Sequence, residues 1–245
     1  MNSGEAVSPK LLAGFGKSIE DRIQSDLGAV ASDMYPDLHD IKNLAGESTG
    51  YVRTYTADKL IKACCLSVNV MPGGRYFNIH ILTDPKFMIP RFGFEGMITT
   101  QGSQVSMDFY PDMDLVMQID EFLAICGDMP AIYDEAKASD LPVQTSRLTH
   151  MRAFCSPFFI NAPGSTADQL PQLEATANRY FDEWLRIYNT ARELSPEEAA
   201  ERQKRRDHFA EKIIELDPDR AMIVQVYGEE TTCAIEEAMM RSVLA

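Results

Sequence analysis

Apolar residues recur at helical spacing near the start of the chain. One face of the expected helix carries Leu11, Leu12, Phe15, Ile19 and Ile23, positions three or four residues apart as a helix requires. We expect this helix to run from Ser8 to Met34, because the sequence Tyr35-Pro36-Asp37 is a strong stop signal.

The next part of the chain has the short apolar runs and turn sequences that are typical of strands. Expected strands are residues 51–56, 60–70, 77–82, 91–100 and 105–110. The turn sequences between them are Met71-Pro72-Gly73-Gly74, Asp84-Pro85-Lys86 and Gln101-Gly102-Ser103. Connections this short join neighbouring strands as hairpins, so the pattern predicts an antiparallel meander.

Helical periodicity returns in the second half. Helices are expected at residues 115–126, 167–194 and 196–216, with a shorter pair after Pro218. A helix, a meander and further helices predict an α/β fold, a three-layer α/β/α sandwich with one central antiparallel sheet. We expect a single domain over residues 1–245, made of an N-terminal helix (1–40), the meander (50–112) and a mainly helical part with pocket-closing segments (113–245).

Composition narrows the class of protein. The 245 residues are 45% hydrophobic and 24% charged, an ordinary globular balance. No apolar stretch approaches the ~20 residues of a membrane helix, and the first residues lack the pattern of a secretory signal. We therefore expect a soluble, cytoplasmic monomer. The formal net charge of −14 argues against nucleic acid as a partner. Five cysteines without a Cys-x-x-Cys sequence and four scattered histidines indicate no metal site.

The middle strands carry the candidate chemistry. Side chains alternate along a strand, so His80 lies on the face opposite Phe77, Ile79 and Ile81. The next hairpin is expected to bring Glu95 to the face of His80, beside Met97, Met107 and Phe109. Burial would raise the pKa of the carboxyl group, and a neighbouring carboxylate would raise that of the imidazole. Such a pair holds a proton near neutral pH, although a lone histidine in a strand is more often a satisfied core residue.

An ordered set of motifs resembles the ferredoxin-dependent bilin reductases, a family that includes phycocyanobilin:ferredoxin oxidoreductase. The set spans about residues 50–242 and comprises His80, Pro90-x-Phe92-Gly93-x-Glu95, Gly102, Asp108-Phe109-x-Pro111, Arg152-x-x-x-Ser156-Pro157-x-Phe159, Asp217-Pro218-x-Arg220 and Tyr227-Gly228-Glu229-Glu230. No single motif is specific, but their order and spacing together are.

The resemblance implies a bilin held between the sheet and the C-terminal helices. It implies no bound cofactor or metal, with single electrons arriving from a reduced 2Fe–2S ferredoxin and protons passing through radical intermediates. Glu95, His80 and Asp217 fall at the positions of the family's catalytic groups. Contacts to the substrate, including its two propionates, are expected from Arg152, Ser156, Arg220, Met97, Met107 and Phe109.

Glu95 departs from the family pattern, in which aspartate is characteristic. Glutamate at this position is similar to the red chlorophyll catabolite reductases, which indicates a divergent bacterial member. The expected substrate is biliverdin IXα, and the product phycocyanobilin or a dihydrobiliverdin. The departure leaves two alternatives open, namely reduction of another open-chain tetrapyrrole of the chlorophyll-catabolite type and non-catalytic tetrapyrrole binding.

The negative charge of the chain would repel an acidic ferredoxin. The resemblance therefore requires a local basic patch, and we expect it at Lys86, Arg91 and the run Lys204-Arg205-Arg206.

Overall fold

The computed structural model describes residues 7–241, and the strands found there form one antiparallel sheet. Their order across the sheet is β1-β3-β4-β5-β6-β7-β8, with β2 paired to β3. The strands are β1 (Val30–Ser32), β2 (Ile41–Lys42), β3 (Ser48–Thr56), β4 (Leu60–Met71), β5 (Gly74–Thr83), β6 (Arg91–Thr99), β7 (Gly102–Tyr110) and β8 (Ile160–Ser165). The expected meander is β3 to β7, in which each strand pairs with the next.

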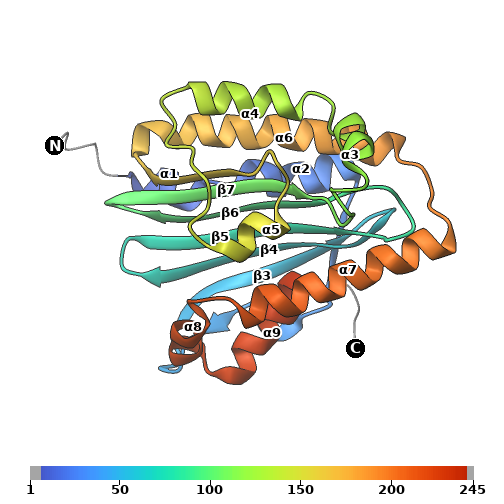
Figure 1. Ribbon diagram of the computed structural model, residues 1–245. Helices are drawn as coiled ribbons and strands as arrows, with labels where there is room; N and C mark the ends of the chain where they lie inside the picture. The colour runs from blue at the N-terminus through green and yellow to red at the C-terminus, as the bar shows by residue number, and fades with distance from the viewer. Residues whose placement is uncertain (1–6, 242–245) are drawn as a thin grey trace.

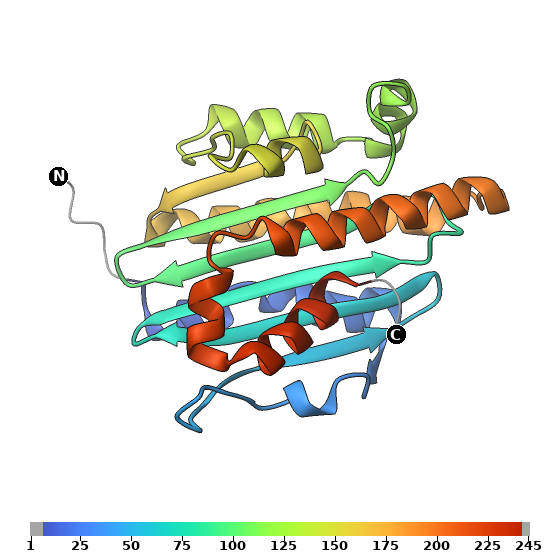
Figure 2. The same cartoon turned by 60° about the horizontal axis from the view of Figure 1, so that its bottom comes forward.

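Helices cover both faces of this sheet, as Figures 1 and 2 show. They are α1 (Pro9–Gly14), α2 (Lys17–Leu27), α3 (Ile119–Cys126), α4 (Met129–Ala138), α5 (Thr149–Phe154), α6 (Leu170–Thr190), α7 (Pro196–Glu215), α8 (Arg220–Tyr227) and α9 (Glu229–Met240), with 3-10 turns η1 (Pro36–Leu38) and η2 (Ala167–Gln169). The α/β/α sandwich predicted from the sequence is confirmed.

The larger hydrophobic core lies on one face of the sheet, under α1, α2 and α6. Helix α6 buries a stripe that includes Leu173, Ala177, Phe181 and Trp184, a spacing that keeps these side chains on one side of a helix. The indole N–H of Trp184 donates a 2.8 Å hydrogen bond to the Pro90 carbonyl, so the polar end of this large side chain is satisfied. Helix α6 is thereby fixed to the start of β6.

The second core is smaller and lies on the opposite face. There α8, α9 and η1 pack on β3 and β4 through residues such as Leu66, Tyr227 and Met239. Helix α7 crosses the same face beside them (Figure 2). Within residues 7–241, no helix is both long enough and apolar enough to span a membrane.

The prediction of one continuous N-terminal helix over residues 8–34 is wrong. The chain breaks after Gly14, and Gly16 adopts a left-handed conformation (φ 83°) as the N-cap of α2. A side chain there would press against the ring of Phe77 at 3.0 Å. The break lets Phe15 point into the core, where it is fully buried. The residues expected to end the helix instead form β1, which pairs with β3.

Three further elements in the second half were not predicted, namely α4, α5 and β8. Strand β8 pairs with β7 and contains Pro163 and Gly164, both of which weaken the strand signal in a sequence. Helix α5 has only six residues, too few to show helical periodicity.

Candidate functional site

The strand register defines the candidate site. Asn78 lies opposite Glu95 and His80 opposite Gly93 across β5 and β6, while Glu95 lies opposite Ser106 across β6 and β7. Because alternate residues share a face, one set of side chains points toward the layer of α7, α8 and α9. We call this set the site face: Tyr76, Asn78, His80, Glu95, Met97, Ser106, Asp108 and Tyr110.

Met107 and Phe109 lie on the other face of the sheet, so the prediction that they sit beside Glu95 is wrong. Their strand partners are Phe94 and Phe92, and all four are buried in the larger core. The reason is the one-residue offset in register, since β7 places Ser106 rather than Met107 opposite Glu95. Met97, which is half-buried, does share the face of Glu95.

Glu95 is half-buried and is held by three donors from the site face. The Tyr76 hydroxyl donates to Oε2 at 2.9 Å, the Asn78 amide donates to the same oxygen at 3.0 Å, and the Ser106 hydroxyl donates to Oε1 at 3.0 Å. Burial raises the pKa of the Glu95 carboxyl above its ordinary value, against the opposing effect of the hydrogen bonds from Tyr76 and Ser106. Glu95 is thus an acid that keeps its proton more readily than a free glutamate.

Asp217 lies near Glu95, in the turn between α7 and α8. Its charge contributes to raising the pKa of both Glu95 and Tyr76, which places the two carboxyl groups in each other's field. Asp217 is exposed at the surface, yet desolvation by the surrounding protein raises the pKa of its carboxyl, and the N–H of Asp219, which donates to it at 2.8 Å, opposes that rise. The fold therefore brings together two of the three predicted catalytic residues, one from the sheet and one from the helical layer.

His80 is buried beneath the end of α9 rather than paired with a carboxylate. Its Nδ1 lies 3.0 Å from the Met239 carbonyl, and its Nε2 has no hydrogen-bond partner among residues 7–241. Burial, followed by the nearby charge of Arg91, lowers the pKa of His80 to about 3. The expectation that a carboxylate raises this pKa is wrong, because His80 faces Gly93 across the strands. A neutral ring with Nδ1 against a carbonyl carries its hydrogen on Nδ1.

Two of the three residues expected to bind the propionates already have partners within the protein. The Ser156 hydroxyl donates to Asp108 at 2.5 Å, and its backbone N–H donates to the same carboxyl at 2.7 Å. Arg220 donates to Glu229 and Glu236 at 2.7 Å each. Arg152 on α5 is exposed and forms no ion pair within the described residues. Of the three, Arg152 alone has a guanidinium group free to bind an incoming carboxylate.

Asp108 belongs to the site face but was not predicted as a functional residue. Burial raises its pKa to about 7, although the two hydrogen bonds from Ser156 act in the opposite direction. Together with Ser156 it joins β7 to the segment that follows α5. Alternation along β7 did not reveal it, because the expected register put Met107 and Phe109, and not Asp108, on the face of Glu95.

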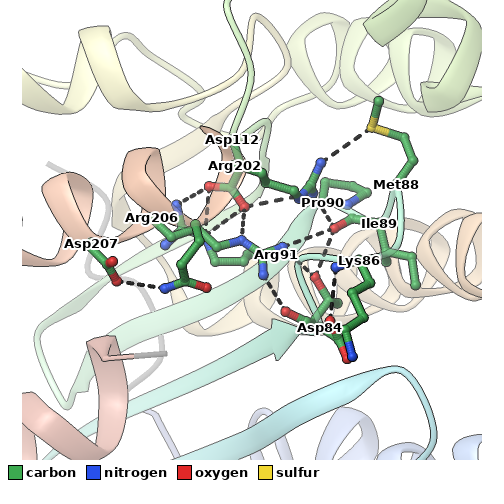
Figure 3. A network of polar contacts seen from close by, with 12 residues as sticks. Asp84, Lys86, Met88, Ile89, Pro90, Arg91, Asp112, Arg202, Arg206 and Asp207 are labelled. Atoms are coloured by element: carbon green, nitrogen blue, oxygen red, sulfur yellow. Dashed lines mark hydrogen bonds and ion pairs between the residues drawn. The ribbon is translucent and has the colours of Figure 1, made fainter. Parts of the chain in front are cut away.

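A buried arginine cluster fixes α7 across the ends of the central strands (Figure 3). Arg91 and Arg206 bind the Asp112 carboxylate at 2.5 and 2.8 Å, and Arg202 lies 3.8 Å from it. Arg206 also binds Thr83 and the Thr83 carbonyl. The expectation of a basic surface patch is therefore wrong for Arg91 and Arg206, which are 2% and 1% exposed.

No metal-binding cluster of three or more His, Cys, Asp or Glu side chains occurs within residues 7–241. A cavity of about 530 Å³ lies between the end of α7, α8 and α9. Its lining includes Arg220, Cys233 and Glu236, and it includes no residue of the site face.

The chain therefore belongs to a structural class in which one antiparallel sheet carries a hydrogen-bonded acid on the face that the C-terminal helices cover. Among solved structures, selenomethionine phytochromobilin synthase from tomato, crystallised in complex with biliverdin, has this fold. The match has a TM-score of 0.81 at 15% sequence identity and covers 93% of this chain and 83% of that chain. The chain therefore shares the fold of a member of the ferredoxin-dependent bilin reductase family. No protein-family model matches the sequence, and no curated protein matches it.

Proposed function

We propose that the chain binds a linear tetrapyrrole between the site face and the helices α7 to α9, and reduces it with electrons from a reduced ferredoxin. The proposal rests mainly on Glu95. This half-buried acid has three hydrogen-bond donors and a raised pKa, and it faces the helical layer that contains Asp217. The shared fold with a protein crystallised with biliverdin supports the choice of substrate class.

Reduction of one double bond consumes two electrons and two protons. Ferredoxin supplies the electrons one at a time, so the protein needs no bound redox cofactor, and two acids, one on the site face and one in the helical layer, supply the protons. Glu95 donates the first proton from the sheet, and Asp217 donates the second from the helical layer. Arg152, exposed and without an ion pair, binds a propionate through its guanidinium fork.

His80 has a different role in this proposal from the one that the sequence suggests. With its hydrogen on Nδ1 bound to Met239, the free Nε2 is an acceptor. Because Nε2 is buried beneath α9, it can accept a hydrogen bond from a pyrrole N–H only when α9 moves off the site face, and it has no proton to give. Two proton donors match a two-electron reduction, so we propose that biliverdin IXα is converted to a dihydrobiliverdin rather than to phycocyanobilin. An open-chain chlorophyll catabolite is the alternative substrate.

The test is an anaerobic absorbance assay with purified protein, biliverdin and a system that keeps ferredoxin reduced. We expect a shift of the biliverdin bands on binding, followed by a blue-shifted product that chromatography identifies. Glu95→Gln should bind biliverdin and lose at least 100-fold in rate, on the order of a general acid's contribution. Glu174→Gln is the matched control, because Glu174 holds Ser18 of α2 on the opposite face of the sheet.

Each other outcome has a distinct meaning. Binding without reduction by the wild-type protein would indicate a tetrapyrrole carrier. Reduction only of a chlorophyll catabolite would change the substrate but not the reaction class. No spectral response to any open-chain tetrapyrrole would overturn the proposed function.

A further inference from the structure

The three donors around Glu95 differ in what they can do when the carboxyl gains a proton. Asn78 uses one amide nitrogen to donate both to Glu95 Oε2 at 3.0 Å and to the Tyr76 hydroxyl at 2.9 Å. An amide nitrogen only donates. Tyr76, already accepting from Asn78, turns its own hydrogen toward Oε2 at 2.9 Å. Oε2 therefore accepts two hydrogen bonds. If the carboxyl proton were on Oε2, no acceptor would be in place to receive it.

The other carboxyl oxygen has a partner of a different kind. Oε1 lies 3.0 Å from the Ser106 hydroxyl, which belongs to the neighbouring strand β7. A serine hydroxyl rotates and both donates and accepts. It can donate to the carboxylate and, after rotation, accept from the carboxylic acid. Ser106 is buried, so solvent does not replace it in this role.

We propose that Tyr76 and Asn78 are positioning residues that confine the Glu95 proton to Oε1, where Ser106 serves as its partner in both states. The inference rests on the proposed function for its catalytic meaning. In the reaction the Oε1–H bond breaks, the proton goes to the tetrapyrrole carbon that receives the electron from ferredoxin, and Glu95 is left as the carboxylate. The proton has then left from Oε1, on the β7 side of the carboxyl, and Ser106 turns back to donate to the resulting carboxylate.

The groups that face Glu95 come from several elements. Tyr76 lies on β5, Tyr110 on β7, Cys155 follows α5, and Asp217 lies in the turn between α7 and α8. Tyr110 and Cys155 are neutral at physiological pH because burial raises the pKa of both. Among these groups, Asp217 is the one whose charge changes in the same pH range as that of Glu95. The titration of Glu95 is therefore repeated in Asp217→Asn, which removes this second charge.

The experiment measures the protonation midpoint of Glu95 directly, without substrate. Protein labelled with ¹³C at the glutamate carboxyl is titrated by NMR, and Glu95→Gln identifies the signal. Tyr76→Phe and Asn78→Ala each remove a donor that serves only the carboxylate, so each should raise the midpoint by about one pH unit. Ser106→Ala removes a partner of both states and should move the midpoint by much less.

The relative size of the rise in the Glu95 midpoint among the three variants shows which oxygen carries the proton. A larger rise in Ser106→Ala than in Asn78→Ala would place the proton on Oε2 and overturn the inference, as would equal rises in all three. Tyr76→Phe retains the ring and so keeps the test valid if Asn78→Ala does not fold. Because no tetrapyrrole is present, failure of the proposed function leaves these midpoints interpretable, and in an active enzyme the pH–rate profile of Tyr76→Phe should shift in the same direction.

Discussion

At the scale of single residues, Asp112 is the carboxylate on which the buried arginine cluster depends. Its side chain is 1% exposed and is the acid nearest to Arg91, Arg202 and Arg206. Burial would raise its pKa, but the three guanidinium groups hold the pKa well below the usual range of an aspartate. The cluster keeps an excess of positive charge, which main-chain carbonyls of Thr83 and Ile89 partly solvate.

We predict that Asp112→Asn lowers the free energy of unfolding by about 3–5 kcal/mol, the usual cost of breaking a buried ion pair from one side. Asparagine tolerates the left-handed backbone at this position (φ 50°), so the change isolates the charge. Urea unfolding measures the loss. Asp182→Asn is the control, since it removes an exposed partner of Arg22, and a loss for Asp112→Asn no larger than that of the control would contradict the prediction.

The arginines also show where prediction at this scale reached its limit. The run Lys204-Arg205-Arg206 looks like a solvated basic face, and Lys204 and Arg205 are indeed exposed. Arg202 and Arg206 are four residues apart and continue to Phe209 and Ala210, which are buried on the same helix face. That spacing was visible in the sequence. What was not visible is Asp112, which supplies the compensating charge from a distant part of the chain.

At the scale of elements, the end of α9 is fastened by two polar side chains of the central strands. His80 from β5 binds the Met239 carbonyl at 3.0 Å, and Lys62 from β4 donates to the Glu237 carbonyl at 3.1 Å. Lys62 also donates to the Tyr35 hydroxyl at 2.7 Å. Both side chains are buried, so α9 can lift away from the site face only when these bonds break.

The burial of Lys62 makes the attachment of α9 depend on pH. Burial lowers the pKa of Lys62 from 10.5 to about 8. Between these values the unfolded chain binds more protons at this site than the folded one, so the contribution of Lys62 to stability rises with pH. We predict that the unfolding free energy of the wild type, minus that of Lys62→Met, increases by up to about 3 kcal/mol from pH 8 to pH 10.5.

Chemical denaturation across that range tests the Lys62 prediction, and taking the difference between the two proteins cancels groups that titrate in both. Lys42→Met reports the effect of removing an exposed lysine. If the difference between the wild type and Lys62→Met stays constant or falls with pH, burial does not lower the pKa of Lys62 and the prediction is wrong.

Elements whose pattern repeats were the ones that the sequence could predict. Strands β3 to β7 and helices α6 and α7 differ from expectation by a few residues at their ends, where the local signal is weakest. The site face followed from alternation up to Glu95. The prediction failed on β7. The register between two strands depends on the turn between them, and a shift of one residue exchanges the faces. The contact of His80 with α9 lies beyond any local pattern.

At the scale of the whole molecule, the charge of −14 bears on the proposed electron donor, because ferredoxins are usually acidic and would be repelled by it. The Debye length at physiological salt is about 8 Å, so a few local cations can guide an encounter that the net charge opposes. Arg91 and Arg206 are buried and cannot contribute. Of the basic residues first expected to form the patch, Lys86 and Lys204 are exposed and form no ion pair within residues 7–241.

We predict that Lys204→Glu raises the ferredoxin concentration needed for half-maximal turnover several-fold at low salt, and leaves biliverdin affinity and the maximal rate unchanged. The control is Lys10→Glu, which makes the same change in net charge on α1, a helix that packs on the other face of the sheet. Steady-state kinetics at two ionic strengths separate the cases, because screening should reduce the Lys204 effect. If both variants weaken the response to ferredoxin equally, net charge rather than a local site governs the encounter. If neither does, ferredoxin docks away from α7.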